Sequence, residues 1–104
     1  MRQDIKNFVN GLNRRNFTNN TQRVLYALLQ GLEKADDGWV NLASTRIGSA
    51  PSRARDLRKE RFGPFTVECS TTKSIGRNNK ANYMYRLASK GLTITKLRRV
   101  FGEV

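Results

Sequence analysis

Apolar residues recur at helical spacing most clearly in residues 21–34. The apolar positions of this segment form one wide stripe, typical of a helix that packs one face against a core: Val24, Leu25, Leu28, Leu29 and Leu32. We expect Thr21 to be the N-cap, because its hydroxyl oxygen can accept a backbone N–H of the first turn. The sequence Asp36-Asp37-Gly38 then predicts a turn.

The pattern changes to short elements in the middle of the chain. Residues 39–42 predict a brief extended segment, and residues 42–47 predict a short helix that Gly48 ends. Residues 49–62 predict a further helix, which we expect to begin at Ser49 or Ala50. Pro51 falls in its first turn, where the missing N–H has no intrahelical partner to lose.

Two segments with an alternating pattern follow. Period-two alternation over residues 65–70 and 83–87 predicts two strands, and residues 71–82 predict a polar hairpin loop. Cys69 shares the apolar side of the first strand. We therefore expect it to be a small buried hydrophobic residue and not a reactive thiol.

Both ends of the chain predict short amphipathic helices. Residues 1–20 are expected to hold a helix and a basic, Asn-rich arm, residues 21–88 the central domain, and residues 89–104 a C-terminal amphipathic helix. The apolar positions of the two end helices are Ile5, Phe8, Val9 and Leu12, and Ile94, Leu97, Val100 and Phe101. They predict packing on the domain itself or on a second copy, and a homodimer is the hypothesis that follows.

Charge narrows the class of partner. The 104 residues include 20 Lys and Arg against 8 Asp and Glu, which gives a net charge of +12. Such an excess in a small domain points to a polyanionic partner, either nucleic acid or an anionic membrane surface. We expect one domain in a reducing cytoplasm, because we find one Cys, no secretory signal and no transmembrane run.

The predicted helix at residues 49–62 carries most of the candidate chemistry. At 100° per residue, Ala50, Ala54, Leu57 and the stem of Arg61 share one side, which we expect to face the core. The exposed sides hold the residues that we expect to read bases, which are Ser49, Ser52, Arg53 and Arg55, because Arg binds guanine bidentately in the major groove. Lys59 is expected to contact phosphate, and Arg46 belongs to the same basic group. The alternative is a solvated face on which Asp56 and Glu60 pair with neighbours three or four residues away.

The polar hairpin loop provides a second candidate contact. No acidic residue occurs in residues 70–91. The candidate phosphate or minor-groove contacts of the loop are Lys73, Arg77, Asn78 and Lys80. The alternative is a hairpin tip that its charge keeps soluble.

The order of predicted elements resembles the small winged helix-turn-helix domains of bacteriophage and other prokaryotic regulators. The matching segments in residues 21–87 are TQRVL at 21–25, LASTRIG at 42–48, SRARDLRK at 52–59 and YMYRL at 83–87. The resemblance implies an α+β fold with a three-helix core and a two-stranded wing, flanked here by a short helix at each end. The segment at 42–48 is short for the first helix of the motif.

The resemblance and the charge together predict a sequence-specific double-stranded DNA-binding protein, a transcriptional regulator of a phage or mobile element. Two alternatives are an RNA-binding or ribosome-associated protein and a winged-helix module that binds a polymerase or an assembly factor. A recombination or replication accessory role would use the same DNA contacts. We expect no enzyme activity, no cofactor, no metal, no membrane partner and no small-molecule substrate, because the chain has no His, phosphate-loop motif or metal-ligand spacing.

Overall fold

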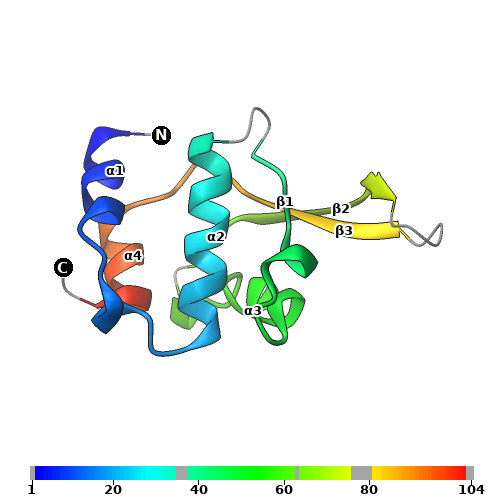
Figure 1. Ribbon diagram of the computed structural model, residues 1–104. Helices are drawn as coiled ribbons and strands as arrows, with labels where there is room; N and C mark the ends of the chain where they lie inside the picture. Colours follow the sequence, from blue (N-terminus) through cyan, green and yellow to red (C-terminus); the bar gives the residue numbers. More distant parts are fainter. Residues whose placement is uncertain (1, 35–37, 63, 76–80, 103–104) are drawn as a thin grey trace.

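Four α-helices and a small antiparallel sheet build the chain in the computed structural model, which describes residues 2–34, 38–62, 64–75 and 81–102 (Figure 1). The elements, with short 3₁₀ helices labelled η, follow in the order α1 (Gln3–Asn10), η1 (Arg14–Asn16), α2 (Asn20–Lys34), β1 (Val40–Asn41), η2 (Leu42–Thr45), α3 (Ala50–Asp56), η3 (Glu60–Phe62), β2 (Val67–Ile75), β3 (Ala81–Leu87) and α4 (Ile94–Phe101). The α+β class predicted from the sequence is confirmed.

Within these residues the sheet has three antiparallel strands in the order β1-β3-β2, and not only the two strands of the expected hairpin. Val40 of β1 and Cys69 of β2 both lie opposite Tyr85, so β3 is the central strand. The extended segment predicted at residues 39–42 therefore becomes the third strand.

The hairpin of β2 and β3 is longer than the sequence predicts. Strand β2 continues to Ile75 and β3 begins at Ala81, so residues 71–75 and 81–82 of the expected loop belong to the strands. Ser74 lies opposite Asn82 and Ile75 opposite Ala81, after an irregularity in the pairing between Ser70 and Ser74. Ladder hydrogen bonds need only the backbone, and this part of the hairpin extends past the helices (Figure 1). The core therefore imposes no apolar alternation there, and the sequence gives no strand signal.

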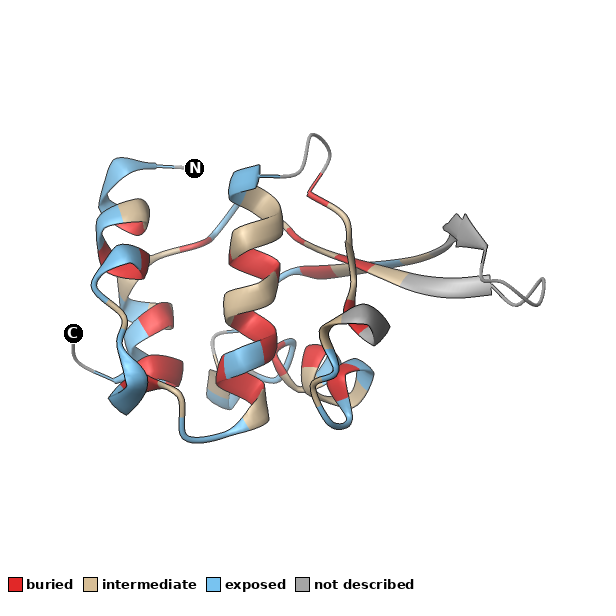
Figure 2. Cartoon of the chain, viewed as in Figure 1, coloured by how far each residue is buried: buried red, intermediate tan, exposed pale blue. Residues whose placement is uncertain are grey.

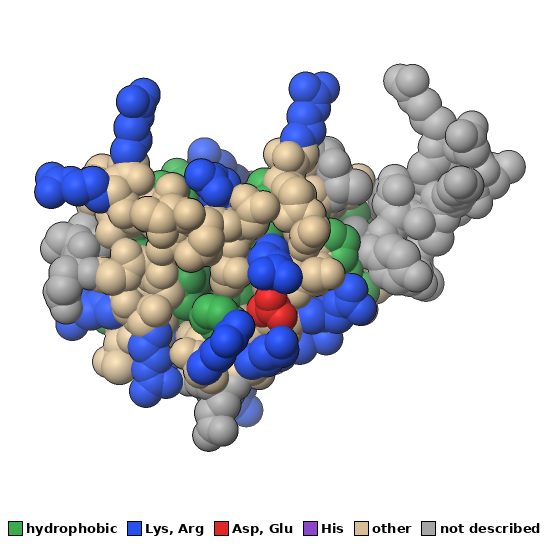
Figure 3. All heavy atoms as spheres, turned by 90° about the horizontal axis from the view of Figure 1, so that it is seen from below, with side chains coloured by type: hydrophobic (Ala, Val, Ile, Leu, Met, Phe, Trp, Pro, Cys, Tyr) green, Lys and Arg blue, Asp and Glu red, His purple; other side chains and the backbone are tan. Residues whose placement is uncertain are grey.

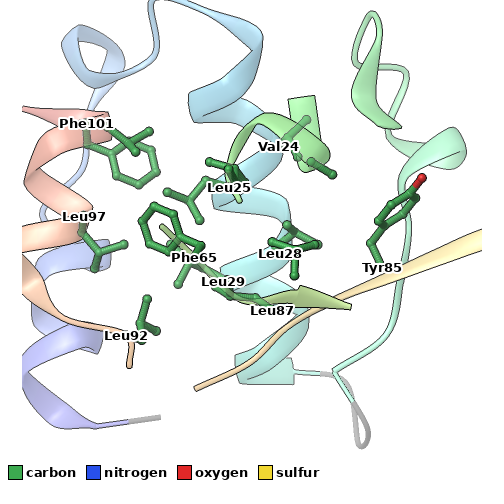
Figure 4. Packing of buried hydrophobic residues seen from close by; sticks show 14 of the residues in the cluster. Val24, Leu25, Leu28, Leu29, Phe65, Tyr85, Leu87, Leu92, Leu97 and Phe101 are labelled. Carbon is green, nitrogen blue, oxygen red and sulfur yellow. The ribbon is translucent and has the colours of Figure 1, made fainter. Parts of the chain in front are cut away.

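Helix α2 runs through the middle of the molecule, with α1 and α4 on one side and α3 and the sheet on the other (Figure 1). Figure 2 shows buried residues on the inward sides of all four α-helices. In the core, Leu25, Leu28 and Leu29 of α2 point into one cluster with Leu97 of α4 and the sheet residue Leu87 (Figure 4). One hydrophobic cluster thus joins the central elements to the two end helices.

The end helices use their apolar faces within the chain. Ile5 and Val9 of α1 and Leu97 of α4 are buried, and the ring centroids of Phe8 and Phe101 lie 6.4 Å apart. These residues meet the prediction that the end helices pack on their own domain. A homodimer stays a prediction, but it would need another surface.

The start of α2 is capped two residues earlier than expected. The Asn19 side chain accepts from Gln22 N at 3.0 Å, and the Gln22 side chain accepts from Asn19 N at 3.0 Å, so the two residues form a reciprocal capping box. Thr21, the expected N-cap, lies inside the helix and is buried. Asn19 is the N-cap because its side-chain oxygen accepts from the backbone of the third helical residue, Gln22, and the Gln22 amide side chain returns a hydrogen bond.

Two buried amides, one before α2 and one in its first turn, tie the end of α4 to this part of the chain. Asn16 Nδ2 donates to Phe101 O at 2.9 Å, and Gln22 Nε2 donates to Val100 O at 2.9 Å. These carbonyls lie in the last turn of α4, where intrahelical donors are missing. The segment expected as an arm is therefore partly built into the core through Asn16.

We expect Gly31→Ala to lower the free energy of unfolding by about 1–3 kcal/mol, as overpacking does. A Cβ on Gly31 would overlap Cγ2 of Val40 and lie 3.2 Å from Gly38 O. In a solvent-exposed helix the same change stabilises the protein by about 0.5–1 kcal/mol. The sign of the change in unfolding free energy therefore already tests the packing of α2 on β1. Urea denaturation measures both this variant and Gly31→Ala/Val40→Ala. The loss in the double variant should be smaller than the sum of the two single losses, and strict additivity would contradict the contact.

Candidate nucleic-acid interface

The turn before α3 has an unusual backbone. The short helix predicted at residues 42–47 is the 3₁₀ helix η2, which ends at Thr45. Arg46 and Ser49 then adopt left-handed conformations, with φ of 59° and 56°. Residues other than glycine adopt this region at a cost in energy, and such strain often accompanies functional sites. Both side chains are exposed at the amino end of α3.

The amino end of α2 anchors this turn. Asn20 Nδ2 donates to Gly48 O at 3.0 Å, and Arg23 Nη1 donates to Asn20 Oδ1 at 3.1 Å. Arg23 is exposed. It therefore adds a cation beside the start of α3. Arg23 is not among the residues predicted from the sequence, because a single Arg on a different helix shows no sequence spacing that links it to α3.

Helix α3 buries the side that the sequence predicts. Ala50, Ala54 and Leu57 are buried, and Pro51 occupies the first turn. The helix ends at Asp56, however, and the prediction that it runs to residue 62 is wrong. The carbonyl of Leu57 accepts from Phe65 N at 2.8 Å, so the chain folds back to bring Phe65 into the core.

The early end of α3 changes the position of Arg61. Its stem is expected on the core side of a continuous helix, but the residue is exposed and its guanidinium lies 4.6 Å from the centre of the Phe62 ring. The helical phase that predicts burial no longer applies beyond Asp56. Arg61 instead covers an aromatic ring at the surface.

Asp56 pairs with two of the candidate residues. Asp56 Oδ2 lies 3.3 Å from Arg53 Nη2, and Asp56 Oδ1 lies 3.0 Å from Lys59 Nζ. The hydrogen bond from Lys59 lowers the pKa of Asp56, and the positive charge of Arg53 lowers it further. The alternative of a salt-bridged helix face is therefore observed for these three residues. Among the described side chains, the other basic residues of the site form no ion pair with Asp56.

We expect Asp56→Asn to raise the affinity for duplex DNA of arbitrary sequence and to steepen the salt dependence by about 1–2 in log–log slope. The change removes a negative charge and releases Arg53 and Lys59 for phosphate contacts. Fluorescence anisotropy over a range of salt concentrations measures both quantities. The control is Glu33→Gln, which breaks the Lys6 ion pair of 3.1 Å far from α3. Equal effects of the two variants would show that only net charge matters.

Arg55 of α3 and Arg58 in the turn after it line a pocket with Cys69 and Tyr85 of the hairpin. Arg58 Nε donates to Val67 O at 2.8 Å and so ties the turn after α3 to the start of β2. Cys69 is exposed, so the prediction that it is buried is wrong. The residue lies opposite the buried Tyr85 and lines the open pocket beside α3.

The hairpin contributes less to the described site. Lys73 lies in β2, but its side chain is outside the described set, and Arg77, Asn78 and Lys80 lie outside the described residues altogether. At the base of the sheet, Arg86 Nη2 lies 2.6 Å from Glu68 Oε2, and its guanidinium lies 4.6 Å from the centre of the Trp39 ring.

A basic surface covers the end of the molecule at which α3 and the start of α2 lie. Figure 3 views this end, and Lys and Arg side chains project from most of it, whereas acidic side chains appear at one place among basic ones. The structure brings together six of the predicted residues around α3 and the turn before it: Arg46, Ser49, Ser52, Arg53, Arg55 and Lys59. Ser49 occupies the N-cap position without a capping hydrogen bond from its side chain.

Comparisons with known proteins give this site no precedent: no protein-family model matches the chain, and no curated protein or solved structure matches it either. In the part of the chain that the structure describes, no group of three or more acidic, Cys or His side chains is placed to hold a metal ion. No helix there has the length and apolar character needed to cross a membrane.

Proposed function

We propose that the protein binds double-stranded DNA in a sequence-specific manner, as a winged helix-turn-helix protein. In this assignment α2, η2 and α3 are the three helices of the motif, and β2 and β3 are the wing. The order of elements and the strand order β1-β3-β2 support the assignment.

The observation that carries the proposal is the exposed basic surface on and around α3, next to a hairpin that projects from the body (Figures 1 and 3). A major groove admits an α-helix, and side chains near the amino end of that helix reach the base edges. Ser49, Ser52 and Arg53 have this position. The carboxylate of Asp56 holds the guanidinium of Arg53 at 3.3 Å and so limits the orientations in which it meets a base.

The remaining cations would supply affinity. Arg23, Arg46 and Lys59 surround α3 and would neutralise phosphates, with counterion release as the driving force. The hairpin residues Lys73, Arg77, Asn78 and Lys80 are proposed for the flanking groove or backbone. Transcriptional regulation in a phage or mobile element is the biological role that we propose, and it rests on the resemblance of residues 21–87 to such regulators.

A competition experiment separates this function from its alternatives. A labelled duplex is bound at about 150 mM salt, where purely electrostatic binding is weak, and is competed with duplex DNA, single-stranded DNA and structured RNA. We expect duplex DNA to compete best. Preferential displacement by RNA would replace the proposal with an RNA-binding function. Loss of all nucleic-acid binding at this salt would favour a protein-interaction module.

A further inference from the structure

A pocket of about 370 Å³ opens between α3 and the hairpin. Its lining residues come from both elements and from the turn after the helix: Pro51, Arg55, Arg58, Cys69 and Tyr85. The volume lies in the range of small-ligand sites, roughly 300–1,000 Å³.

Backbone register fixes one wall of the pocket. Cys69 and Tyr85 lie directly opposite each other in the β2–β3 ladder, so their side chains project from the same face of the sheet. In Figure 4, Tyr85 stands apart from the other labelled core residues. This wall combines an aromatic ring with a phenol hydroxyl and an exposed thiol.

The opposite wall carries two guanidinium groups. Asp56, the acidic residue within α3, is engaged with Arg53 and Lys59. Among the described side chains, neither Arg55 nor Arg58 forms an ion pair. The hydrogen bond from Arg58 Nε to Val67 O, at 2.8 Å, orients the Arg58 guanidinium and leaves its two terminal amino groups for another acceptor.

Tyr85 adds a neutral donor. Burial raises the pKa of Tyr85, and the charge of the neighbouring Cys69 and a side-chain hydrogen bond with it raise the pKa further, whereas Arg55 and Arg58 act in the opposite direction. The phenol therefore keeps its proton at neutral pH and can donate a hydrogen bond. Two cations and one hydroxyl donor around an open space match the acceptor oxygens of a tetrahedral anion.

We infer that this pocket binds a phosphate-type anion, held by the guanidinium groups of Arg55 and Arg58 and the hydroxyl of Tyr85. The anion is either a phosphodiester of the DNA backbone or the phosphoryl group of a free small molecule. The inference for the pocket does not depend on DNA binding, and only its DNA source rests on the proposed function.

Titration of the free protein with pyrophosphate, followed by amide NMR, tests the pocket without DNA. We expect saturable shifts at residues 51–58 and around Cys69 and Tyr85, and an affinity about tenfold weaker in Arg55→Gln. Arg14→Gln removes the same charge from the exposed surface of η1 and should leave the affinity unchanged. Shifts spread over all basic segments, or equal losses in both variants, would overturn the inference.

The single cysteine of the chain provides a second readout, and its main comparison uses the unaltered protein, so it does not depend on how the Arg variants fold. Cys69 lines the pocket and is exposed, so bound pyrophosphate should slow its alkylation by neutral iodoacetamide several-fold. The anionic reagent iodoacetate should react faster relative to iodoacetamide than it does with a cysteine peptide, and Arg55→Gln should reduce that preference. An unchanged alkylation rate at saturating pyrophosphate would contradict anion binding in this pocket.

Duplex DNA distinguishes the two sources of the anion. If a backbone phosphodiester occupies the pocket, duplex DNA protects Cys69 as pyrophosphate does, and Arg55→Gln reduces the salt slope of DNA binding by about 1. If DNA binds without protecting Cys69, the pocket serves a free phosphorylated molecule. If DNA does not bind at all, the proposed function fails, and the pyrophosphate experiments still show whether the pocket binds an anion.

Discussion

Leu28→Ala is expected to lower the free energy of unfolding by about 2–5 kcal/mol, the range for a large aliphatic side chain replaced in a core. Leu28 is 0% exposed and lies in the middle of α2, between the end helices and the sheet (Figure 4). The free energy of unfolding of a protein domain is roughly 5–15 kcal/mol in total, so this loss is a large part of the stability.

Leu32→Ala is the matched control, because Leu32 lies four residues further along the same helix and is only partly buried. We expect a smaller loss for this variant. Urea denaturation at constant m-value measures both. Equal losses would mean that the centre of the core does not lie at Leu28.

Arg53→Ala is expected to cost about 1–3 kcal/mol on the preferred DNA sequence and almost nothing on unrelated sequences, because a bidentate base contact discriminates by that amount. Arg55→Ala is expected to weaken binding to all sequences about equally, because the pocket beside the hairpin directs Arg55 toward a phosphate. Binding isotherms on the preferred duplex and on a scrambled duplex measure both variants.

The two arginines lie two residues apart in one short helix, so each variant controls for the charge that the other removes. A uniform loss for Arg53→Ala would remove this residue from base readout. A selective loss for Arg55→Ala would place Arg55 on a base, as the helical pattern alone predicts, and not on a phosphate.

The helical and alternating patterns predicted the elements that the core constrains. The stripe of α2, the buried side of α3 and the apolar faces of the end helices are determined by burial, which repeats with the period of the element. Thr93 caps α4 through a hydrogen bond from Lys96 N, at the boundary that the pattern gives. These features depend on local spacing, so a single sequence is enough to find them.

Features set by long-range contacts were not predictable in the same way. Helix α3 ends at Asp56, and the carbonyl of Leu57 then accepts from Phe65 N, eight residues later, and not from the next turn of a helix. Cys69 shares the alternation of a buried strand but is exposed in the pocket between α3 and the hairpin. The local pattern of apolar and polar residues predicts neither the end of α3 nor the exposure of Cys69.

The candidate site was predicted in its residue types better than in its geometry. Basic residues around α3 stand out by composition, but their division into an Asp56-paired group and a pocket-facing pair depends on the phase and end of the helix. Arg23 joins the site only through Asn20 and the turn before α3.

Selection of random duplex DNA by the purified protein at about 150 mM salt tests sequence-specific binding most directly, since purely electrostatic binding is weak under that condition. We predict an enriched motif whose preference Arg53→Ala flattens. A two-fold repeat in the motif would further indicate a dimer and give its spacing. An unenriched pool, with binding that vanishes as salt rises, would contradict base readout by α3 and reduce this surface to nonspecific contact with polyanions.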